Sequence, residues 1–248
     1  MKPHLSRYWM TTTEKDPVHF RQQAEAVCLT YAQAIDQAQR GDHTVSLDEM
    51  TGIQALERTA PTKPSRPGLI ERREFEYIRH GTQTLIANFD VPSGQVICPS
   101  LGDTRTETDF VAHIAQTVAT DPDARWTFVL DQLNIHQSEG LVMWVAQQCH
   151  LSEALGQKGK TGILATMASR AAFLTDPTHR IRFVYTPKHS SWLNQIELWF
   201  SILMRRLLKR ASFVSIADLN QRILEFIAFF NRTAKPFKWT YTGRPLCA

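Results

Sequence analysis

The stretch EYIRHGTQTLIANFDVPSGQVICPSLG, from Glu76 to Gly102, contains two strand-like runs on either side of the turn signal PSG. This pattern predicts a β-hairpin. The segment before it, HTVSLDEMTGIQAL (43–56), alternates between apolar and polar residues and predicts one more strand. We therefore expect three antiparallel strands in this part of the chain.

The remainder of the chain alternates between helical and strand patterns. Phe110, Ile114 and Val118 recur at helical spacing after a Thr- and Asp-rich start, which predicts a capped helix ending near Asp121. The segments that follow predict a buried strand, a helix, a strand, a long helix and a last helix with a Ser-x-x-Asp cap: WTFVLDQLNIH (126–136), SEGLVMWVAQQCH (138–150), RIRFVYTP (180–187), SWLNQIELWFSILMRRLLKR (191–210) and SIADLNQRILEFIAFFNR (215–232).

This order of elements predicts an α/β fold with a mixed five-stranded sheet, three strands antiparallel and two parallel, flanked by helices. It is the layout of the ribonuclease H-like fold, although other α/β sheets share it. Residues 1–40 contain an amphipathic helical lead-in, and we expect one domain over 41–248. PTKPSRPG (61–68) reads as a solvated loop, and the stretch between the second helix and the next strand is rich in loop residues.

Composition indicates a globular protein with an uneven charge distribution. The chain has 248 residues, of which 43% are hydrophobic. Residues 1–150 hold 13 Lys and Arg against 19 Asp and Glu, whereas residues 151–248 hold 15 against 5. The basic half is a candidate surface for a polyanion; the alternative is that the two halves neutralise each other across an interface.

Localisation and redox state follow from what the sequence lacks. No apolar run approaches the roughly 20 residues that span a bilayer, and the N-terminus has no signal-peptide core, so we expect a soluble cytoplasmic protein with no membrane partner. The cysteines form no CxxC pair, so neither a disulfide framework nor a zinc ribbon is indicated.

Asp48 and Asp131 are the first candidates for chemistry, because each sits at or near the end of an apolar strand pattern. A carboxylate there faces the cleft beyond the strand ends, where α/β sheets tend to bind ligands. Taken singly, each also fits an ordinary turn-forming or helix-capping Asp.

Glu197 is the third candidate. On its predicted helix it falls on a polar strip, Asn194, Glu197, Ser201 and Arg205, and off the apolar stripe formed by Leu193, Ile196, Phe200, Leu203 and Leu207. Large apolar neighbours such as Trp192, Leu198 and Trp199 bound this strip, which indicates one wall of a cleft. The alternative is an ordinary solvent-facing Glu.

Three carboxylates converging on a cleft suit hard divalent ions, because Mg²⁺ prefers oxygen ligands and keeps several waters. Two such ions can serve phosphodiester displacement. The chain has no GxSxG or HExxH motif, and GQKGKTG (156–162) lacks the first glycine of a phosphate-binding loop. We interpret it as a mobile basic loop, with Lys158, Lys160 and Arg170 facing phosphates or water. His136 and His189 stand near the proposed acids and could assist them or be structural.

Five blocks, LDEMTGIQALER, EYIRHGTQTLIANFDVPSGQV, FVLDQLNIH, TPKHSSWLNQIELWFSIL and KPFKWTYTG, together resemble the DDE endonuclease domain of transposases from the bacterial insertion-sequence 630 family, part of the Tc/mariner superfamily. The similarity runs from about Arg7 to the C-terminus. It implies a ribonuclease H-like catalytic core. It also implies that Asp48, Asp131 and Glu197 are the metal-binding triad for two Mg²⁺ ions, with Mn²⁺ as a substitute.

The resemblance also implies an activity and partners. Family members cut DNA at terminal inverted repeats and join the freed 3′-hydroxyl to target DNA, so we expect DNA as partner, a homodimer in the DNA complex and association with the bacterial nucleoid. Supporting roles behind the acids fall to Glu49, Gln132, His136, His189 and Asn194. The expected DNA contacts are Lys158, Lys160, Arg170, Lys188, Arg205, Arg206, Lys209 and Arg210.

Three departures from the family pattern limit these expectations. Gln132 stands where relatives usually carry Asn, and residues 147–178 resemble an insertion. Fewer than 50 residues precede Asp48, whereas members normally carry a helix-turn-helix region there, so residues 1–40 could be a linker remnant and the recognition half could be separately encoded. The alternative function is a truncated, catalytically silent derivative that binds DNA or dimerises with a transposase.

Overall fold

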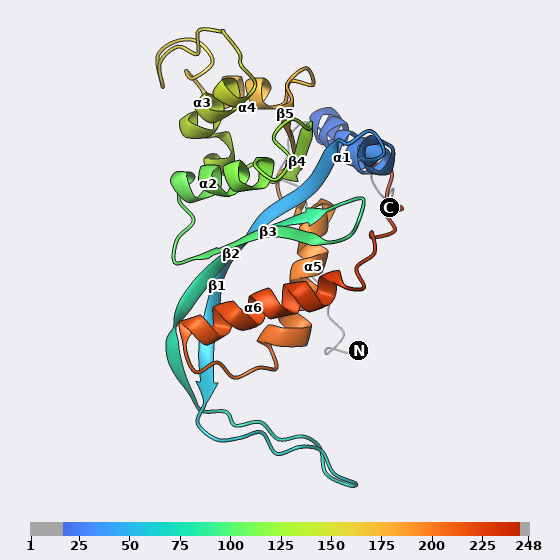
Figure 1. The fold of residues 1–248 in the computed structure, drawn as a ribbon, viewed down its shortest axis with the longest axis vertical. Coiled ribbons are helices and arrows are strands. Elements are labelled where there is room, and N and C mark those ends of the chain that lie inside the picture. Colours follow the sequence, from blue (N-terminus) through green and yellow to red (C-terminus); the bar gives the residue numbers. More distant parts are fainter. Residues whose placement is uncertain (1–16, 244–248) are drawn as a thin grey trace.

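A five-stranded sheet of order β3-β2-β1-β4-β5 forms the centre of the protein (Figure 1). The structure is a computed structural model that describes residues 17–243. The strands are β1 (His43–Arg58), β2 (Tyr77–Asp90), β3 (Val96–Gly102), β4 (Trp126–Leu130) and β5 (Ile181–Tyr185). β1, β2 and β3 pair antiparallel, while β4 lies parallel to β1 and β5 parallel to β4. The predicted hairpin and mixed sheet are therefore confirmed.

Helices cover both faces of this sheet. They are α1 (Pro17–Ala38), α2 (Glu107–Val118), α3 (Glu139–Gln148), α4 (Met167–Leu174), α5 (Gln195–Leu203) and α6 (Ile216–Asn231). α2, α3 and α4 share one hydrophobic core with β1, β4 and β5. α5 and α6 pack on the opposite face of the sheet, and α1 covers the end of that opposite face. No described helix is long and apolar enough to cross a membrane.

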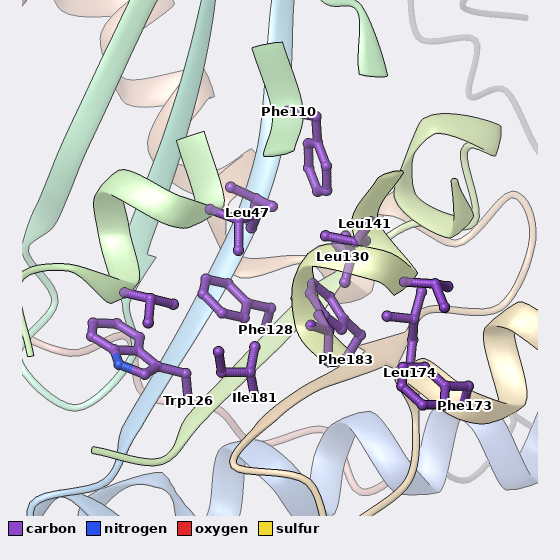
Figure 2. Close-up of a cluster of buried hydrophobic side chains, with 14 of the residues drawn as sticks. Leu47, Phe110, Trp126, Phe128, Leu130, Leu141, Phe173, Leu174, Ile181 and Phe183 are labelled. Carbon is purple, nitrogen blue, oxygen red and sulfur yellow. The ribbon is translucent and has the colours of Figure 1, made fainter. Parts of the chain in front are cut away.

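The core on the α2 side takes alternate residues of the two parallel strands. Phe128, Leu130, Ile181 and Phe183 are fully buried there, and Trp126 is 1% exposed (Figure 2). Complete burial of each large apolar side chain contributes roughly 1.5–3 kcal/mol. The short strands β4 and β5 are thereby fixed, and with them the loops at their carboxyl ends.

The stretch after α3 is more ordered than predicted. α4 forms within residues 147–178, and its Phe173 and Leu174 enter the same core. Thr166 and Ser169 form a capping box that starts this helix. The prediction of a loop-rich stretch missed α4, because eight residues are too few for a clear helical period.

The predicted long helix over 191–210 is divided into three pieces. A 3₁₀ turn (Ser191–Leu193) precedes α5, and a π-helical turn (Met204–Leu208) follows it. Asn194 lies between the first two pieces with extended backbone angles and serves as N-cap of α5. The single-helix prediction was therefore wrong at Asn194, whose side chain is used for contacts with β1.

β1 and β2 extend beyond the sheet into an exposed two-stranded arm, residues 59–76 (Figure 1). Isolated bridges pair Lys63 with Arg72 and Arg66 with Leu69. The predicted loop 61–68 is fully exposed, as expected, but it is partly β-paired. The arm thus projects from the far end of the strand that carries Asp48.

Candidate active site

β1 sends successive side chains to opposite faces of the sheet at the proposed site. Val45 and Leu47 join the core on the α2 side, whereas Ser46 and Asp48 contact Asn194 at the start of α5. Glu49, next in line, returns to the α2 side and reaches His136. The dipeptide Asp48-Glu49 therefore supplies one carboxylate to each face.

Asp48 is held by two donors. Its Oδ1 accepts a hydrogen bond from the backbone N–H of Glu49 at 2.8 Å, and its Oδ2 accepts one from Asn194 Nδ2 at 3.2 Å. Burial raises the pKa of Asp48 to about 7, and the charges of Asp131, Glu49 and Glu197 add to that rise. Asp48 is therefore costly to ionise unless a cation compensates it.

Asp131 follows β4 directly and has the opposite tendency. Its Oδ1 accepts a hydrogen bond from the backbone N–H of Leu133 at 2.9 Å and lies 2.8 Å from His136 Nδ1. Burial alone would raise the pKa of Asp131, but the hydrogen bond and charge of His136 outweigh it and hold the pKa below its usual value. Asp131 is thus an anion with 44% of its side chain exposed.

His136 is fully buried between two carboxylates. Its Nε2 lies 2.8 Å from Glu49 Oε1, and the Glu49 side chain is only 1% exposed. Burial would lower the pKa of His136, yet the hydrogen bonds and charges of Asp131 and Glu49 raise it to about 9. The imidazolium form accounts for both contacts, because each ring nitrogen then donates.

Asn194 ties the first acid to the helix that carries the third. Its Nδ2 donates to Leu47 O at 2.9 Å as well as to Asp48, and Ser46 Oγ donates to its Oδ1. Ser46 Oγ in turn accepts from the backbone N–H of Ile196 at 2.9 Å. The prediction that Asn194 shares an open polar strip with Glu197 was wrong, since Asn194 is completely buried as a bridge to β1.

Glu197 lies in the first turn of α5 and is half-buried. Burial raises its pKa, and the charge of Asp131 adds to the rise. Together with the effects on Asp48, this places Asp48, Asp131 and Glu197 within electrostatic reach of one another. Within residues 17–243, however, no three His, Cys, Asp or Glu side chains form a ready metal cluster.

Other predicted residues lie around this centre. Gln132 Nε2 donates to Thr186 O at 3.0 Å and to Gln23 Oε1 at 3.3 Å, so it joins two loops rather than reaching the acids. Lys188 and His189 are exposed, and both line a cavity of about 370 Å³ that Asp131 borders. His189 has a left-handed backbone with φ of 59°.

The predicted basic contacts other than Lys188 fall into three groups. Arg170 was predicted wrongly, because it is 7% exposed and donates to the carbonyls of Gln137 and Leu164, which stabilises α4. Lys158 is exposed and pairs with Glu139 at 3.4 Å, while Lys160 is exposed. The remaining four, Arg205, Arg206, Lys209 and Arg210, are exposed on and after the π-helical turn.

A family model matches the part of the chain that carries this site. The model described as DDE superfamily endonuclease matches residues 43–220, which include all three acids. The chain belongs to this family. None of the curated proteins matches the sequence significantly.

Solved structures confirm the fold of this DDE endonuclease. The Mos1 mariner paired end complex with Mn aligns with a TM-score of 0.51 at 13% identity, over 91% of this chain and 60% of that one. The catalytic domain of Mos1 mariner transposase aligns with a TM-score of 0.48 at 12% identity, over 89% and 85%. The alignment with the paired end complex confirms the predicted ribonuclease H-like fold, and the chain spans about 60% of the length of that Mos1 transposase.

Two contacts of the DDE endonuclease site were not predicted from the sequence. The role of Ser46 between Asn194 and Ile196 has no motif of its own. The pairing of Glu49 with His136 joins residues 87 positions apart. The alternation of β1 could have indicated that Glu49 faces away from Asp48, but nothing local indicates its partner.

Proposed function

We propose that this DDE endonuclease is the catalytic part of a DNA transposase of the insertion-sequence 630 type. In this proposal it cleaves DNA strands at the ends of an element and transfers them into target DNA. What carries the proposal is that Asp48, Asp131 and Glu197, contributed by β1, the end of β4 and α5, all lie within residues 43–220, which the DDE endonuclease model matches.

The donor set fits Mg²⁺, with Mn²⁺ as a substitute. All three ligands are carboxylates, and the raised pKa values of Asp48 and Glu197 indicate anions that gain from a nearby divalent cation. Mg²⁺ usually keeps waters and substrate phosphates in its shell, so an open arrangement of one or two carboxylates per ion suffices. Two bound ions would supply activation of the attacking oxygen and stabilisation of the leaving oxygen.

The chain's own residues orient these ligands. His136, itself held by Glu49, fixes Oδ1 of Asp131, and no hydrogen bond within the described residues uses Oδ2. Asn194 fixes Asp48 and, as N-cap of α5, sets the position of the helix that carries Glu197. Such outer contacts commonly determine ligand orientation and metal affinity.

DNA is the proposed partner, bound as a substrate at both the element ends and the target. Mos1 transposase has been solved in a paired-end complex with a transposon end and in a strand transfer complex. By analogy, we propose a homodimer on DNA, with a helix-turn-helix region that reads the repeats. The exposed cations at the end of α5 would contact backbone phosphates.

A catalytically silent derivative is the second candidate. The chain spans about 60% of the complexed Mos1 transposase, so residues used for recognition in such proteins need not lie in this sequence. A protein of this kind would occupy DNA or dimerise with a transposase without cleaving. The ordered surroundings of all three acids favour the catalytic proposal over this one.

The experiment is a cleavage and joining assay on DNA that carries the flanking inverted repeats. We expect Mg²⁺- or Mn²⁺-dependent cleavage by the purified chain, followed by strand transfer. Asp131→Asn should abolish cleavage with an unchanged circular dichroism spectrum, whereas the exposed control Asp123→Asn should not. Binding without cleavage would favour the silent derivative, and cleavage without joining would indicate a stand-alone nuclease.

A further inference from the structure

A small cavity of about 120 Å³ lies at the base of the arm. Four cationic residues line it, Arg58 from the end of β1, Arg73 from the returning strand of the arm, and Lys209 and Arg210 from the chain just after the π-helical turn. No acidic residue lines it. Three segments far apart in sequence thus bring positive charge to one small volume.

The walls of this cavity are held by hydrogen bonds rather than by chance proximity. The backbone N–H of Phe213 donates to Leu56 O at 2.8 Å, and that of Arg58 donates to Ser212 Oγ at 2.8 Å. Arg73 Nη1 donates to Lys209 O at 2.8 Å. The end of β1, the arm and the segment after α5 therefore form one connected unit.

The charge in the cavity is mostly uncompensated. Arg73 pairs with Glu71 at 2.7 Å, but within the described residues no ion pair involves Arg58, Lys209 or Arg210. Cations held this close together repel one another, so an anion that enters gains from several of them at once. The cavity is well below the roughly 300 Å³ of ordinary small-molecule sites, which suits an anionic group rather than a whole nucleotide.

We propose that this cavity binds one backbone phosphate of the DNA duplex whose strand enters the carboxylate site. Arg58 Nη1 already donates to the carbonyls of Glu74 and Phe75, and Arg73 Nε and Nη1 donate to Glu71 and Lys209. Each Arg therefore offers a phosphate its remaining N–H groups, and Lys adds a point charge. The proposal rests on the proposed function, since it assumes a DNA substrate at Asp48, Asp131 and Glu197. It adds Arg58 and Arg73, which the sequence did not indicate, to Lys209 and Arg210.

The position of the cavity defines which phosphate it takes. Glu197 and Lys209 are 12 residues apart along α5 and the π-helical turn, or about 18 Å at 1.5 Å per residue. Asp48 and Arg58 are 10 residues apart along β1, or about 33 Å at 3.3 Å per residue. At about 3.4 Å per nucleotide, the phosphate lies roughly five to ten nucleotides from the cut.

The test combines neutral phosphates with protein variants. Duplexes carrying the element end receive a single uncharged methylphosphonate at successive positions, and binding is measured without divalent metal. For wild type we expect one phosphate, five to ten nucleotides from the cut, whose neutralisation weakens binding about fivefold. In Lys209→Ala/Arg210→Ala the same substitution should weaken binding clearly less than fivefold, since two of the four partner charges are gone.

Arg205→Ala/Arg206→Ala is the matched control, because it removes the same amount of charge from the adjoining π-helical turn, outside the cavity. It should retain the positional effect even if its overall affinity falls. Arg58→Gln, measured in the same way, guards against local unfolding of the segment after α5. Equal sensitivity in wild type and Lys209→Ala/Arg210→Ala would overturn the proposal, whereas loss of cleavage with the positional effect intact would count only against the proposed function.

Discussion

At the scale of single residues, the surroundings shift the pKa values of the carboxylates of the site in different directions. Asp131 is stabilised as an anion by His136, whereas Asp48 is destabilised by burial and by its acidic neighbours. Pairs of titratable groups with divergent pKa values are typical of functional sites. The difference has consequences that can be measured without substrate.

Asp48→Asn should stabilise the metal-free protein at high pH. An unfolded Asp titrates near pH 3.9, whereas folded Asp48 has a pKa of about 7, so the folded state holds the proton more tightly. Stability from this residue is therefore lost as pH rises from about 4 to 7. In EDTA we expect a melting temperature on the order of 5 °C above wild type at pH 8, and little difference at pH 4.

Mg²⁺ supplies the control for this prediction. It should raise the melting temperature of wild type at pH 8 and raise that of Asp48→Asn much less, because the variant lacks a ligand. A difference between the two proteins that stays constant from pH 4 to pH 8 would contradict the assigned pKa.

Glu49→Gln should weaken metal binding although Glu49 faces away from the proposed metal site. The change keeps the shape of the side chain but removes the charge that holds His136, and with it the orientation of Asp131. Loss of such an outer partner typically costs 10–100-fold in metal affinity. Titration with Mn²⁺, followed by its electron paramagnetic resonance signal, measures this directly.

The control for Glu49 is Glu57→Gln, a similar change on β1 at a partly exposed His–Glu pair far from the acids. It should leave Mn²⁺ affinity unchanged. If Glu49→Gln binds Mn²⁺ as wild type does, His136 orients Asp131 without help from Glu49.

At the scale of helices and strands, α2 carries a second buried histidine with a purely structural setting. His113 is 1% exposed, and its ring nitrogens lie 2.9 Å from Asn88 Nδ2 and 2.7 Å from Ser100 Oγ. Because Asn88 Nδ2 donates, Nε2 accepts and Nδ1 carries the proton. Burial lowers the pKa of His113 to about 3, so the folded protein holds it neutral.

His113 should therefore make the protein sensitive to mild acid. An unfolded His binds a proton near pH 6.5, which folded His113 does not, so stability is lost as pH falls from about 6.5 toward 3. Between pH 6.5 and 5 the loss from this residue is about 2 kcal/mol. Urea unfolding should show that His113→Gln removes this part of the pH dependence; a parallel decline in both proteins would refute it.

Elements with their own periodicity or turn signal were predictable, and elements fixed by distant contacts were not. The hairpin, α1, α2 and α6 follow local patterns, and the Ser215 cap of α6 is present as expected. α4 is held by Phe173 and Leu174 in a core assembled from distant strands. The break at Asn194 arises from bonds to residues almost 150 positions earlier, which no local pattern encodes.

The same distinction applies to the candidate site. Asp131 follows the end of β4 and Glu197 lies on α5, as their local patterns predicted, but the prediction that Asp48 lies at or near a strand end was wrong, because β1 continues to Arg58. Arg170 looked like a surface cation in a basic loop, but its guanidinium satisfies buried carbonyls of the chain around α4. A single sequence does not distinguish an Arg that faces solvent from one that caps carbonyls in a core.

At the scale of the whole molecule, the charge asymmetry is not cancelled internally. Within residues 17–243, Lys158–Glu139 is the one ion pair that joins the acidic first 150 residues to the basic remainder. The alternative that the two halves neutralise each other is therefore not supported. The uncompensated positive charge stays available to a polyanion.

The arm should be separable from the stability of the fold. Residues 61–73 are exposed throughout and contribute nothing to the buried cores. Brief trypsin treatment should cut after Arg72, because Lys63 and Arg66 are each followed by Pro, and the two fragments should remain associated through the pairing of β1 with β2. Gel filtration followed by mass spectrometry measures whether the fragments stay together. Separation of the fragments would show that an unbroken arm is needed to hold the fold together.

The alternation of Asp48 and Glu49 makes the active site a check on correct folding. If β1 paired one residue out of register, Asp48 would face the α2 core and Glu49 would face Asn194. In the shift that puts Asp48 in the place of Leu47, an unneutralised carboxylate would lie in the core that contains Phe110, and His136 would lose a counter-ion. The same two adjacent acids that equip the protein for chemistry thus penalise the most accessible misfolded arrangement of its central strand.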